Sequence, residues 1–199
     1  MPDGRVRVHS DEPFRRRRLA VLFRVLLVIP HAIVLWAWQT LLTFTVPIGW
    51  ILALLLGRLP ARLHRFSAAY LRYQSQVTAW FNLLSGRYPS FRRPREHPFD
   101  VDVPEPQRQS RLAILLRIVL AIPALVLTSV FGVILGALAV GAWFLTLVLG
   151  RITSGMQELG MYCMRYQIET LAYVLLLTPR YPKLESPEPP PQQLMLEFD

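Results

Sequence analysis

Residues 18 to 30 read RLAVLFRVLLVIP, and residues 111 to 123 read RLAILLRIVLAIP. The likeness continues without a gap over residues 18–89 and 111–182, where 24 of 72 aligned positions are identical. It includes RYQ inside each stretch and RYP at its end. Self-similarity of this extent at a fixed offset is the signature of an internal repeat. The chain therefore consists of two tandem copies of one structural unit, repeat one and repeat two.

Each repeat contains 33 consecutive residues without Asp, Glu, Lys or Arg, between Arg24 and Arg58 and between Arg117 and Arg151. A membrane-spanning helix needs about 20 apolar residues, so runs of this length are typical of a bilayer protein. A single straight helix of 33 residues would extend roughly 50 Å, whereas the hydrocarbon core is about 30 Å thick. The excess length favours a helical hairpin in each repeat.

We therefore predict four membrane-spanning helices, two in each repeat. In repeat one the spans are expected at residues 19–40 and 46–57, with the turn between Gln39 and Gly49, a window rich in threonine, proline and glycine. In repeat two they are expected at residues 112–133 and 139–150, with the turn near three glycines. These are Gly132, Gly136 and Gly141.

The charge of the chain is segregated from its apolar runs. The sequence is 53% hydrophobic, yet its net charge is +9, and the arginines lie in blocks that flank the runs. Arginine and lysine beside membrane spans mark the cytoplasmic side, and two hairpins would put every block on that side. We predict a multi-pass protein of the cell (inner) membrane with cytoplasmic N- and C-termini. Contact with anionic head groups already explains such arginines, so no nucleic-acid partner is expected.

A third helix of different character follows each apolar run, at residues 61–85 and 154–178. Apolar and aromatic residues recur there at alternating steps of three and four, which predicts an amphipathic helix with an aromatic stripe. The simplest placements are flat on the cytoplasmic face or packed across the hairpin, and a fifth span in repeat two is the alternative. The stripe consists of Leu63, Phe66, Tyr70, Tyr73, Val77, Trp80 and Leu84, and of Met156, Leu159, Cys163, Tyr166, Thr170, Tyr173 and Leu177.

The remaining segments are polar and rich in proline. The predicted order is a basic N-terminal segment at 1–17, repeat one at 18–91, a charged linker at 92–110, repeat two at 111–182 and an acidic tail at 183–199. The fold class is an all-α integral membrane protein. Its two tandem parallel repeats each combine a transmembrane hairpin with an amphipathic, aromatic and arginine-rich helix.

Candidates for chemistry are few in this sequence. His31 lies in a predicted span, but its counterpart in repeat two is Ala124, and a hydrogen-bonded neutral histidine is favoured over a ligand or proton carrier. Cys163 lies on the apolar stripe, where a buried inert thiol is the simpler interpretation. Metal-ligand spacings and phosphate-binding glycine loops are absent from the sequence. We therefore expect no enzyme activity, no metal and no cofactor.

The ordered motifs of the repeat resemble a bacterial, mostly actinobacterial, membrane protein family, domain of unknown function 4389, in two tandem copies. The resemblance rests on Gly57-Arg58-Leu59-Pro60, Arg72-Tyr73 and the closing Tyr88-Pro89. It implies a membrane protein and no known activity. Five positions depart from the family pattern. Gln76 and Glu169 stand where the family has a second arginine after the Arg-Tyr pair. Gly86 and Pro179 replace the acidic residue before the last motif, and Thr153 replaces the proline of the Gly-Arg-x-Pro motif.

Two hypotheses for function follow from these observations. The first is a non-catalytic accessory or scaffold subunit of a larger membrane complex, which contacts anionic lipid and protein partners through its cytoplasmic arginine and aromatic residues. The second is a small transporter or channel component with an anion site around Arg24 and Arg117 at the repeat interface, against which snorkelling of both arginines is the simpler explanation. The residues expected to contact lipid or a partner are Arg24, Arg58, Arg72, Tyr73, Arg87, Tyr88, Arg117, Arg151, Arg165, Tyr166, Arg180 and Tyr181.

Overall fold

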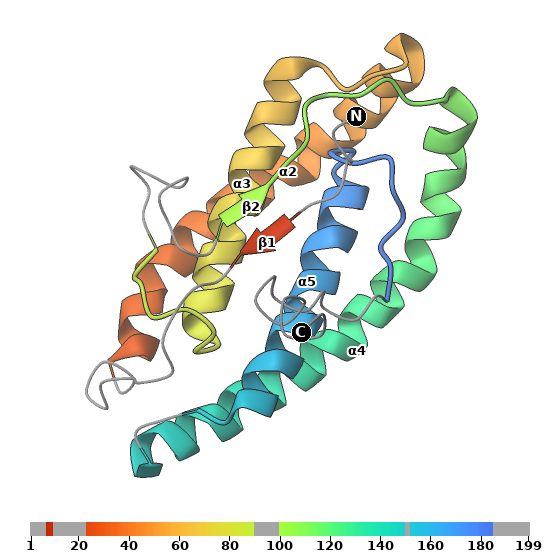
Figure 1. Cartoon of the computed structure of the whole chain (residues 1–199). Coiled ribbons are helices and arrows are strands. Elements are labelled where there is room, and N and C mark those ends of the chain that lie inside the picture. Colours follow the sequence, from red (N-terminus) through yellow and green to blue (C-terminus); the bar gives the residue numbers. More distant parts are fainter. Residues whose placement is uncertain (1–6, 10–22, 90–99, 150–151, 185–199) are drawn as a thin grey trace, which may run out of the picture.

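The computed structural model describes residues 7–9, 23–89, 100–149 and 152–184 of the chain. In chain order its elements are β1 (Arg7–His9), α2 (Arg24–Leu56), α3 (Ala61–Phe81), β2 (Asp100–Asp102), α4 (Arg111–Leu149) and α5 (Ser154–Val174). The two short strands pair antiparallel, with Val8 opposite Val101 (Figure 1). The fold is therefore helical apart from this one small ladder. The predicted N-terminal segment and acidic tail lie almost entirely outside the described residues.

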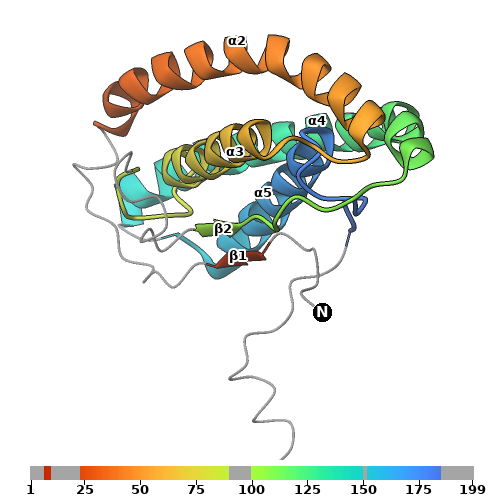
Figure 2. The same cartoon turned by 90° about the horizontal axis from the view of Figure 1, so that it is seen from above.

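Each predicted hairpin is wrong, because one continuous helix takes its place. α2 covers 33 residues and passes straight through the expected turn, with Pro30 and Pro47 both inside it. The threonines that indicated a turn instead form hydrogen bonds within the helix. Thr40, Thr43 and Thr45 each donate to the carbonyl four residues earlier. Figure 2 shows α2 as an arch, and prolines inside a helix are a recognised cause of bending.

α4 is likewise one helix of 39 residues, so the predicted break between residues 133 and 139 is absent. Its glycines are helical. A side chain at Gly136 would meet nothing within 4 Å, and one at Gly132 would meet only the amide of Gln167 at 3.9 Å. Neither glycine therefore marks a turn or a close approach of two helices. At the start of α4, the Ser110 hydroxyl accepts a hydrogen bond from Ala113 N, as expected of an N-cap residue.

α3 and α5 end a turn earlier than predicted, and they end in the same way. Leu83 (φ 63°) and Leu176 (φ 60°), at equivalent positions, are the described non-glycine residues with left-handed backbone. In repeat one, Leu84 N donates to the Ala79 carbonyl at 2.9 Å, and repeat two forms the equivalent bond between Leu177 and Ala172. These contacts form the Schellman motif, which usually has glycine at the left-handed position.

The four helices pack in a closed cycle. α2 contacts α3 and α4, α5 contacts α4 and α3, and β2 lies on α3. Figure 2 shows the β1–β2 pair on the opposite side of α3 from α2. The long helices α2 and α4 thus form one layer, and α3 and α5 form the layer between them and the strands.

The long helices run antiparallel. Arg111, at the start of α4, donates to the Leu55 carbonyl near the end of α2. At the other end of the molecule, Phe81 of α3 packs against Trp143 near the end of α4, with 6.1 Å between ring centroids. The two repeats are therefore related by an approximate twofold rotation, as in a symmetric dimer.

Leucines at the ends of the short helices pack each repeat against the other. Leu176 of repeat two is buried in a cluster with Leu59, Trp50 and other residues of repeat one. Leu83 of repeat one is buried in the equivalent cluster of repeat two, with Ile152 and Trp143 at the positions equivalent to Leu59 and Trp50, and with Ala142 and Met156. Each repeat thus completes a hydrophobic cluster of the other.

Candidate functional site

The first candidate site surrounds the two arginines inside the apolar helices. Arg24 is only 3% exposed and Arg117 only 1%. Arg24 donates to the Trp80 carbonyl at the end of α3, and its guanidinium lies 4.7 Å from the centre of the Trp80 ring. Arg117 donates to the Tyr173 carbonyl at 2.9 Å and lies 4.3 Å from the centre of that ring.

Each arginine therefore binds the C-terminal end of the short helix in its own repeat. A cation there interacts favourably with the helix dipole and with the carbonyls of the last helical turn. The guanidinium also lies over an aromatic face, which adds a cation–π attraction. Snorkelling to lipid head groups does not describe either side chain, because both are buried in protein.

Repeat one carries an additional aromatic cluster beside Arg24. His31 of α2 forms a hydrogen bond through Nδ1 with the Tyr73 hydroxyl of α3. The His31 ring lies 4.8 Å from the Tyr88 ring, between centroids, and Trp80 lies 5.2 Å from Tyr88. Burial raises the pKa of the Tyr73 hydroxyl, so Tyr73 is a neutral partner for this histidine. The contact agrees with the interpretation of His31 as a hydrogen-bonded residue.

Repeat two has no such histidine, because Ala124 occupies the equivalent position and is fully buried. The aromatic contact between Tyr173 and Tyr181 is retained, with 5.5 Å between ring centroids. The cluster around His31 is therefore specific to repeat one, whereas the arginine contact is common to both.

A groove of about 260 Å³ opens between α2, α3 and the end of α5. Its polar feature is a hydrogen bond in which the Tyr70 hydroxyl donates to Gln39 Oε1. Most of the remaining surface is aliphatic. The lining residues are Gln39, Leu42, Thr43, Val46, Pro47, Tyr70, Leu171, Val174 and Leu175.

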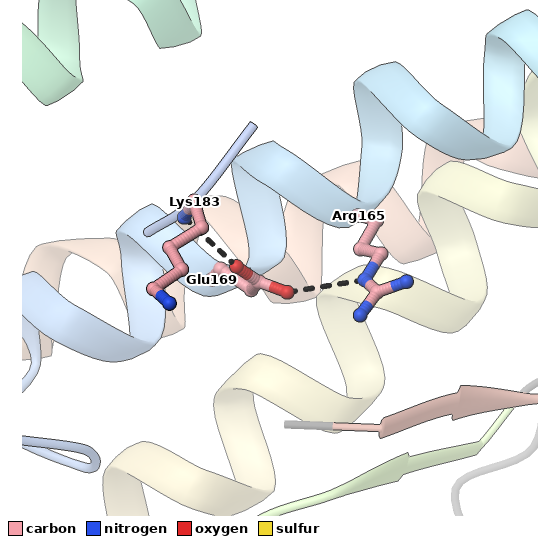
Figure 3. Close-up of polar contacts among 3 residues, drawn as sticks. All are labelled: Arg165, Glu169 and Lys183. Carbon is pink, nitrogen blue, oxygen red and sulfur yellow. Dashed lines mark hydrogen bonds and ion pairs between the residues drawn. The ribbon is translucent and has the colours of Figure 1, made fainter. Parts of the chain in front are cut away.

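Glu169 in repeat two stands where the family pattern has its second arginine. Its side chain connects α5 to the segment that follows this helix. Glu169 Oε1 lies 3.1 Å from Arg165 Nε, and Glu169 Oε2 accepts a hydrogen bond of 3.4 Å from the backbone N–H of Lys183 (Figure 3). In repeat one, Arg72 instead donates to the Val101 carbonyl of β2 at 3.0 Å. The equivalent arginines thus differ, because Arg72 binds β2 whereas Arg165 pairs with Glu169 of its own helix.

The outer surface of the long helices is the most extensive apolar feature. α2 and α4 are long and apolar enough to cross a membrane, and only 11% and 17% of their most apolar windows are buried in the protein. Large side chains such as Trp36 (73% exposed) and Val133 (75% exposed) point away from the protein core. A core helix of a soluble protein would be mostly buried, so these helices have a different role.

The residues expected to contact lipid or a partner divide into distinct environments. Those that are buried in protein are Arg24, Tyr73, Arg117 and Tyr166, and those that are partly buried are Arg72 and Arg165. Those that are exposed are Arg58, Arg87, Tyr88, Arg180 and Tyr181. Arg151 lies outside the described residues. Among the described members, the exposed residues are the most accessible to lipid or a partner.

The structure also bears on the residues considered for chemistry. Cys163 is fully buried, and burial raises the pKa of its thiol, as expected of an unreactive cysteine. Among the described residues, no group of three or more His, Cys, Asp or Glu side chains is placed to hold a metal ion.

Sequence reasoning missed the partners of the buried arginines and the role of Leu83 and Leu176. One signal was present: an aromatic residue follows the arginine by 56 positions in both repeats. Nothing in the leucine-rich context distinguished Leu83 or Leu176 from their neighbours, because a left-handed leucine has no local sequence mark.

Comparison with curated proteins and with solved structures finds no match. A family model does match the chain, over residues 18–92 and again over residues 111–184. These segments coincide with the two repeats and together cover well over half of the sequence. The chain belongs to the family of the domain of unknown function DUF4389, of which it contains two tandem copies.

Proposed function

We propose that this protein is a non-catalytic membrane protein that acts as an accessory or scaffold subunit of a larger membrane complex. The observation that carries the proposal is the exposed apolar surface of α2 and α4. Soluble proteins rarely expose contiguous apolar patches larger than a few hundred Å². A surface formed by the greater part of two long helices is suited to lipid and to other membrane helices.

The use of the interior polar groups supports a structural role. Arg24 and Arg117 bind carbonyls at the ends of short helices. These groups hold helices together, and their hydrogen bonds lie within the protein. A catalytic site would instead direct such groups toward a space that a substrate can enter.

The proposed contact with anionic lipid involves a basic end of the molecule. Arg58, Arg62 and Arg65 are exposed where α2 gives way to α3, and Arg111 is exposed beside them at the start of α4. Each arginine near an anionic surface contributes about 1 kcal/mol of attraction. In this arrangement the aromatic stripes of α3 and α5 pack in the protein core. The long helices and these arginines therefore make the proposed contact with lipid.

Two experiments test the proposal. Extraction of the chain from its native membrane in mild detergent is expected to recover a partner in fixed stoichiometry, whereas recovery as a lone monomer would contradict a subunit role. In vesicle flotation, Arg58→Gln is expected to weaken binding to anionic vesicles. Arg87→Gln removes one exposed charge beside Tyr88, at the opposite end of α2, and is the matched control. Equal binding by both variants would exclude this basic end as the lipid contact.

The geometry does not favour the transporter alternative. The two arginines bind the ends of different short helices, α3 and α5. Arg24 begins α2, whereas Arg117 lies less than two turns from Arg111, which contacts the far end of α2. A shared anion site would need both guanidinium groups to face one space. Anion flux into liposomes that depends on both arginines would restore this hypothesis.

A further inference from the structure

We propose that α2 and α4 lie along the membrane, embedded side by side in its cytoplasmic leaflet, and do not cross the bilayer. This inference rests on the proposed membrane role but goes beyond it, because it fixes the orientation of the molecule. It follows from what the fold places beside the long helices.

The first step is the course of α3, which runs antiparallel along most of α2. Trp80 contacts Arg24 at the start of α2, and Tyr70 contacts Gln39 near its middle. A side chain at Gly49, in the last third of α2, would touch Leu63 at the beginning of α3. Any depth reached by α2 in a bilayer is therefore reached by α3 as well.

The second step is the polar segment that lies on α3. Arg72, in the middle of α3, donates to the carbonyl of Val101 in β2. The neighbouring residues Asp102, Glu105 and Arg108 are exposed. Asp102 is thus fixed opposite the middle of α2, on the far side of α3, and the segment runs from there to Gln109, beside the end of α2.

The third step is the path of the chain from repeat one to repeat two. α3 ends beside Arg24, at the start of α2, while Gln109 N donates to the Gly57 carbonyl just after the end of α2. The chain between these points must travel the full length of α2, roughly 50 Å at 1.5 Å per residue. β2 lies part of the way along that path.

These contacts conflict with a transmembrane orientation. If α2 crossed the bilayer, Asp102 and the strand pair would lie within the hydrocarbon. Each charge at the bilayer centre costs about 2.5–3.5 kcal/mol even on the most lenient scale. Small open sheets such as the β1–β2 pair are also avoided in the hydrocarbon.

An orientation along the membrane satisfies all of these features. The outer faces of α2 and α4 enter the acyl region, while α3, α5 and the strands remain on the aqueous side. Helices placed in this way bury their apolar face about 5–10 Å below the head groups. The arginines Arg58 and Arg111 then lie at head-group level, where a cation is favoured. The approximate twofold axis stands perpendicular to the membrane, so both repeats present the same face to it.

Cysteine labelling from one side of the membrane tests this orientation. Phe23→Cys and Arg58→Cys place exposed thiols at the two ends of α2, and Asp102→Cys places one on the strand side. In sealed inside-out membrane vesicles, an impermeant maleimide is expected to label all three variants before lysis. The unsubstituted chain is the control, because its Cys163 is fully buried.

If α2 crosses the bilayer, one of the two end positions will be labelled only after detergent lysis, and the inference is overturned. A quenching measurement provides an independent check in the event that a cysteine variant folds poorly. Bimane at Ile29 and Ile51, both exposed and near opposite ends of α2, is expected to be quenched by a lipid nitroxide placed in the cytoplasmic leaflet alone. Quenching of the two positions from opposite leaflets would contradict the proposal. Absence of the chain from the membrane fraction would instead refute the proposed membrane role.

Discussion

Arg24 and Arg117 show how an isolated cation in an apolar run can serve the fold. Their position in the runs was visible in the sequence, and it indicated contact with lipid head groups. The structure gives each guanidinium a carbonyl and an aromatic ring at the end of a short helix. That partner could not be predicted, because it depends on the antiparallel return of the chain along the long helix.

The first prediction concerns Arg117. Arg117→Ala is expected to destabilise the protein by about 2–4 kcal/mol, because it empties a buried volume and removes a charge-assisted hydrogen bond. Arg117→Met retains much of the packing and should cost less. Thermal unfolding in detergent measures both changes, with the exposed Arg108→Ala as control. Equal stability of the two alanine variants would show that the buried contact contributes nothing.

The second prediction concerns the left-handed leucine, Leu176. Both Leu176→Gly and Leu176→Ala lose a side chain buried in the other repeat, so both should destabilise the protein. Alanine keeps the strain of a positive φ, whereas glycine releases it, so the glycine variant should be more stable by about 1 kcal/mol. This order is the reverse of the order inside a helix. Chemical denaturation of the pair would reveal it, and a more stable alanine variant would contradict the argument.

The third prediction concerns pH and His64. Burial, and then the nearby charge of Arg72, lowers the pKa of this histidine below its usual 6.5, while Glu105 and the carbonyls of Pro104 and Leu177 oppose the change. The unfolded chain therefore binds a proton more readily than the folded one, and stability rises with pH. The contribution is fully present above pH 6.5 and is lost as the pH falls through the lowered pKa.

His64→Gln supplies the control, since repeat two has Gln157 at the equivalent position. The difference in melting temperature between the two proteins should change between pH 7.5 and pH 5, with the histidine protein losing more. Parallel pH profiles would rule out a role for His64.

At the scale of the elements, composition predicted the existence of every helix but gave the wrong break points. The apolar stripe of α3 and α5 was predicted from spacing, and its central members Tyr70, Tyr73, Val77 and Trp80 are buried. The hairpins failed because they were inferred from bilayer thickness, which limits a helix only if that helix crosses the membrane. Threonine and proline in an apolar helix do not mark a turn when the hydroxyls can bond within the helix.

The fourth prediction concerns the packing of α5 against the end of α3. A methyl group added at Gly160 would lie 2.8 Å from Leu84 Cδ2, whereas one at Gly155 would meet nothing within 4 Å. Gly160→Ala is therefore expected to destabilise the protein by about 1–3 kcal/mol through overpacking. Gly155→Ala should be neutral or stabilising, because alanine is favoured over glycine in a helix. Thermal melts of the two variants that shift by the same amount would contradict this difference.

At the scale of the whole molecule, the duplication and the family were evident from the sequence, and the repeats match the family model. The repeats were predicted to be parallel, whereas their long helices run antiparallel. Each copy has the sequence of a complete unit. Leu83 and Leu176, however, are each buried in a hydrophobic cluster of the other copy, so each copy needs the other to bury the leucine at the end of its short helix. Sequence periodicity describes what a unit contains and carries no information about the rotation that relates two units.

The fifth prediction follows from this exchange. If the chain is divided into residues 1–92 and 93–199, the halves are expected to assemble when they are expressed together, because each supplies the leucine that fills the cluster of the other. Affinity purification of one tagged half should recover the other in equal amount. Failure to associate, with each half well folded alone, would contradict the proposed interlock.

The exchange of leucines has a consequence for how the two copies can diverge. In a dimer of identical chains, every substitution appears on both sides of the axis, so a feature tolerated only once is lost. A fused pair escapes this constraint, since each position can change in one copy alone. Repeat one has His31 in its aromatic cluster where repeat two has alanine, and repeat two has Glu169 where repeat one has glutamine. Fusion has thus made the two halves of a symmetric framework chemically different, in the buried interior at His31 and in a partly exposed position at Glu169.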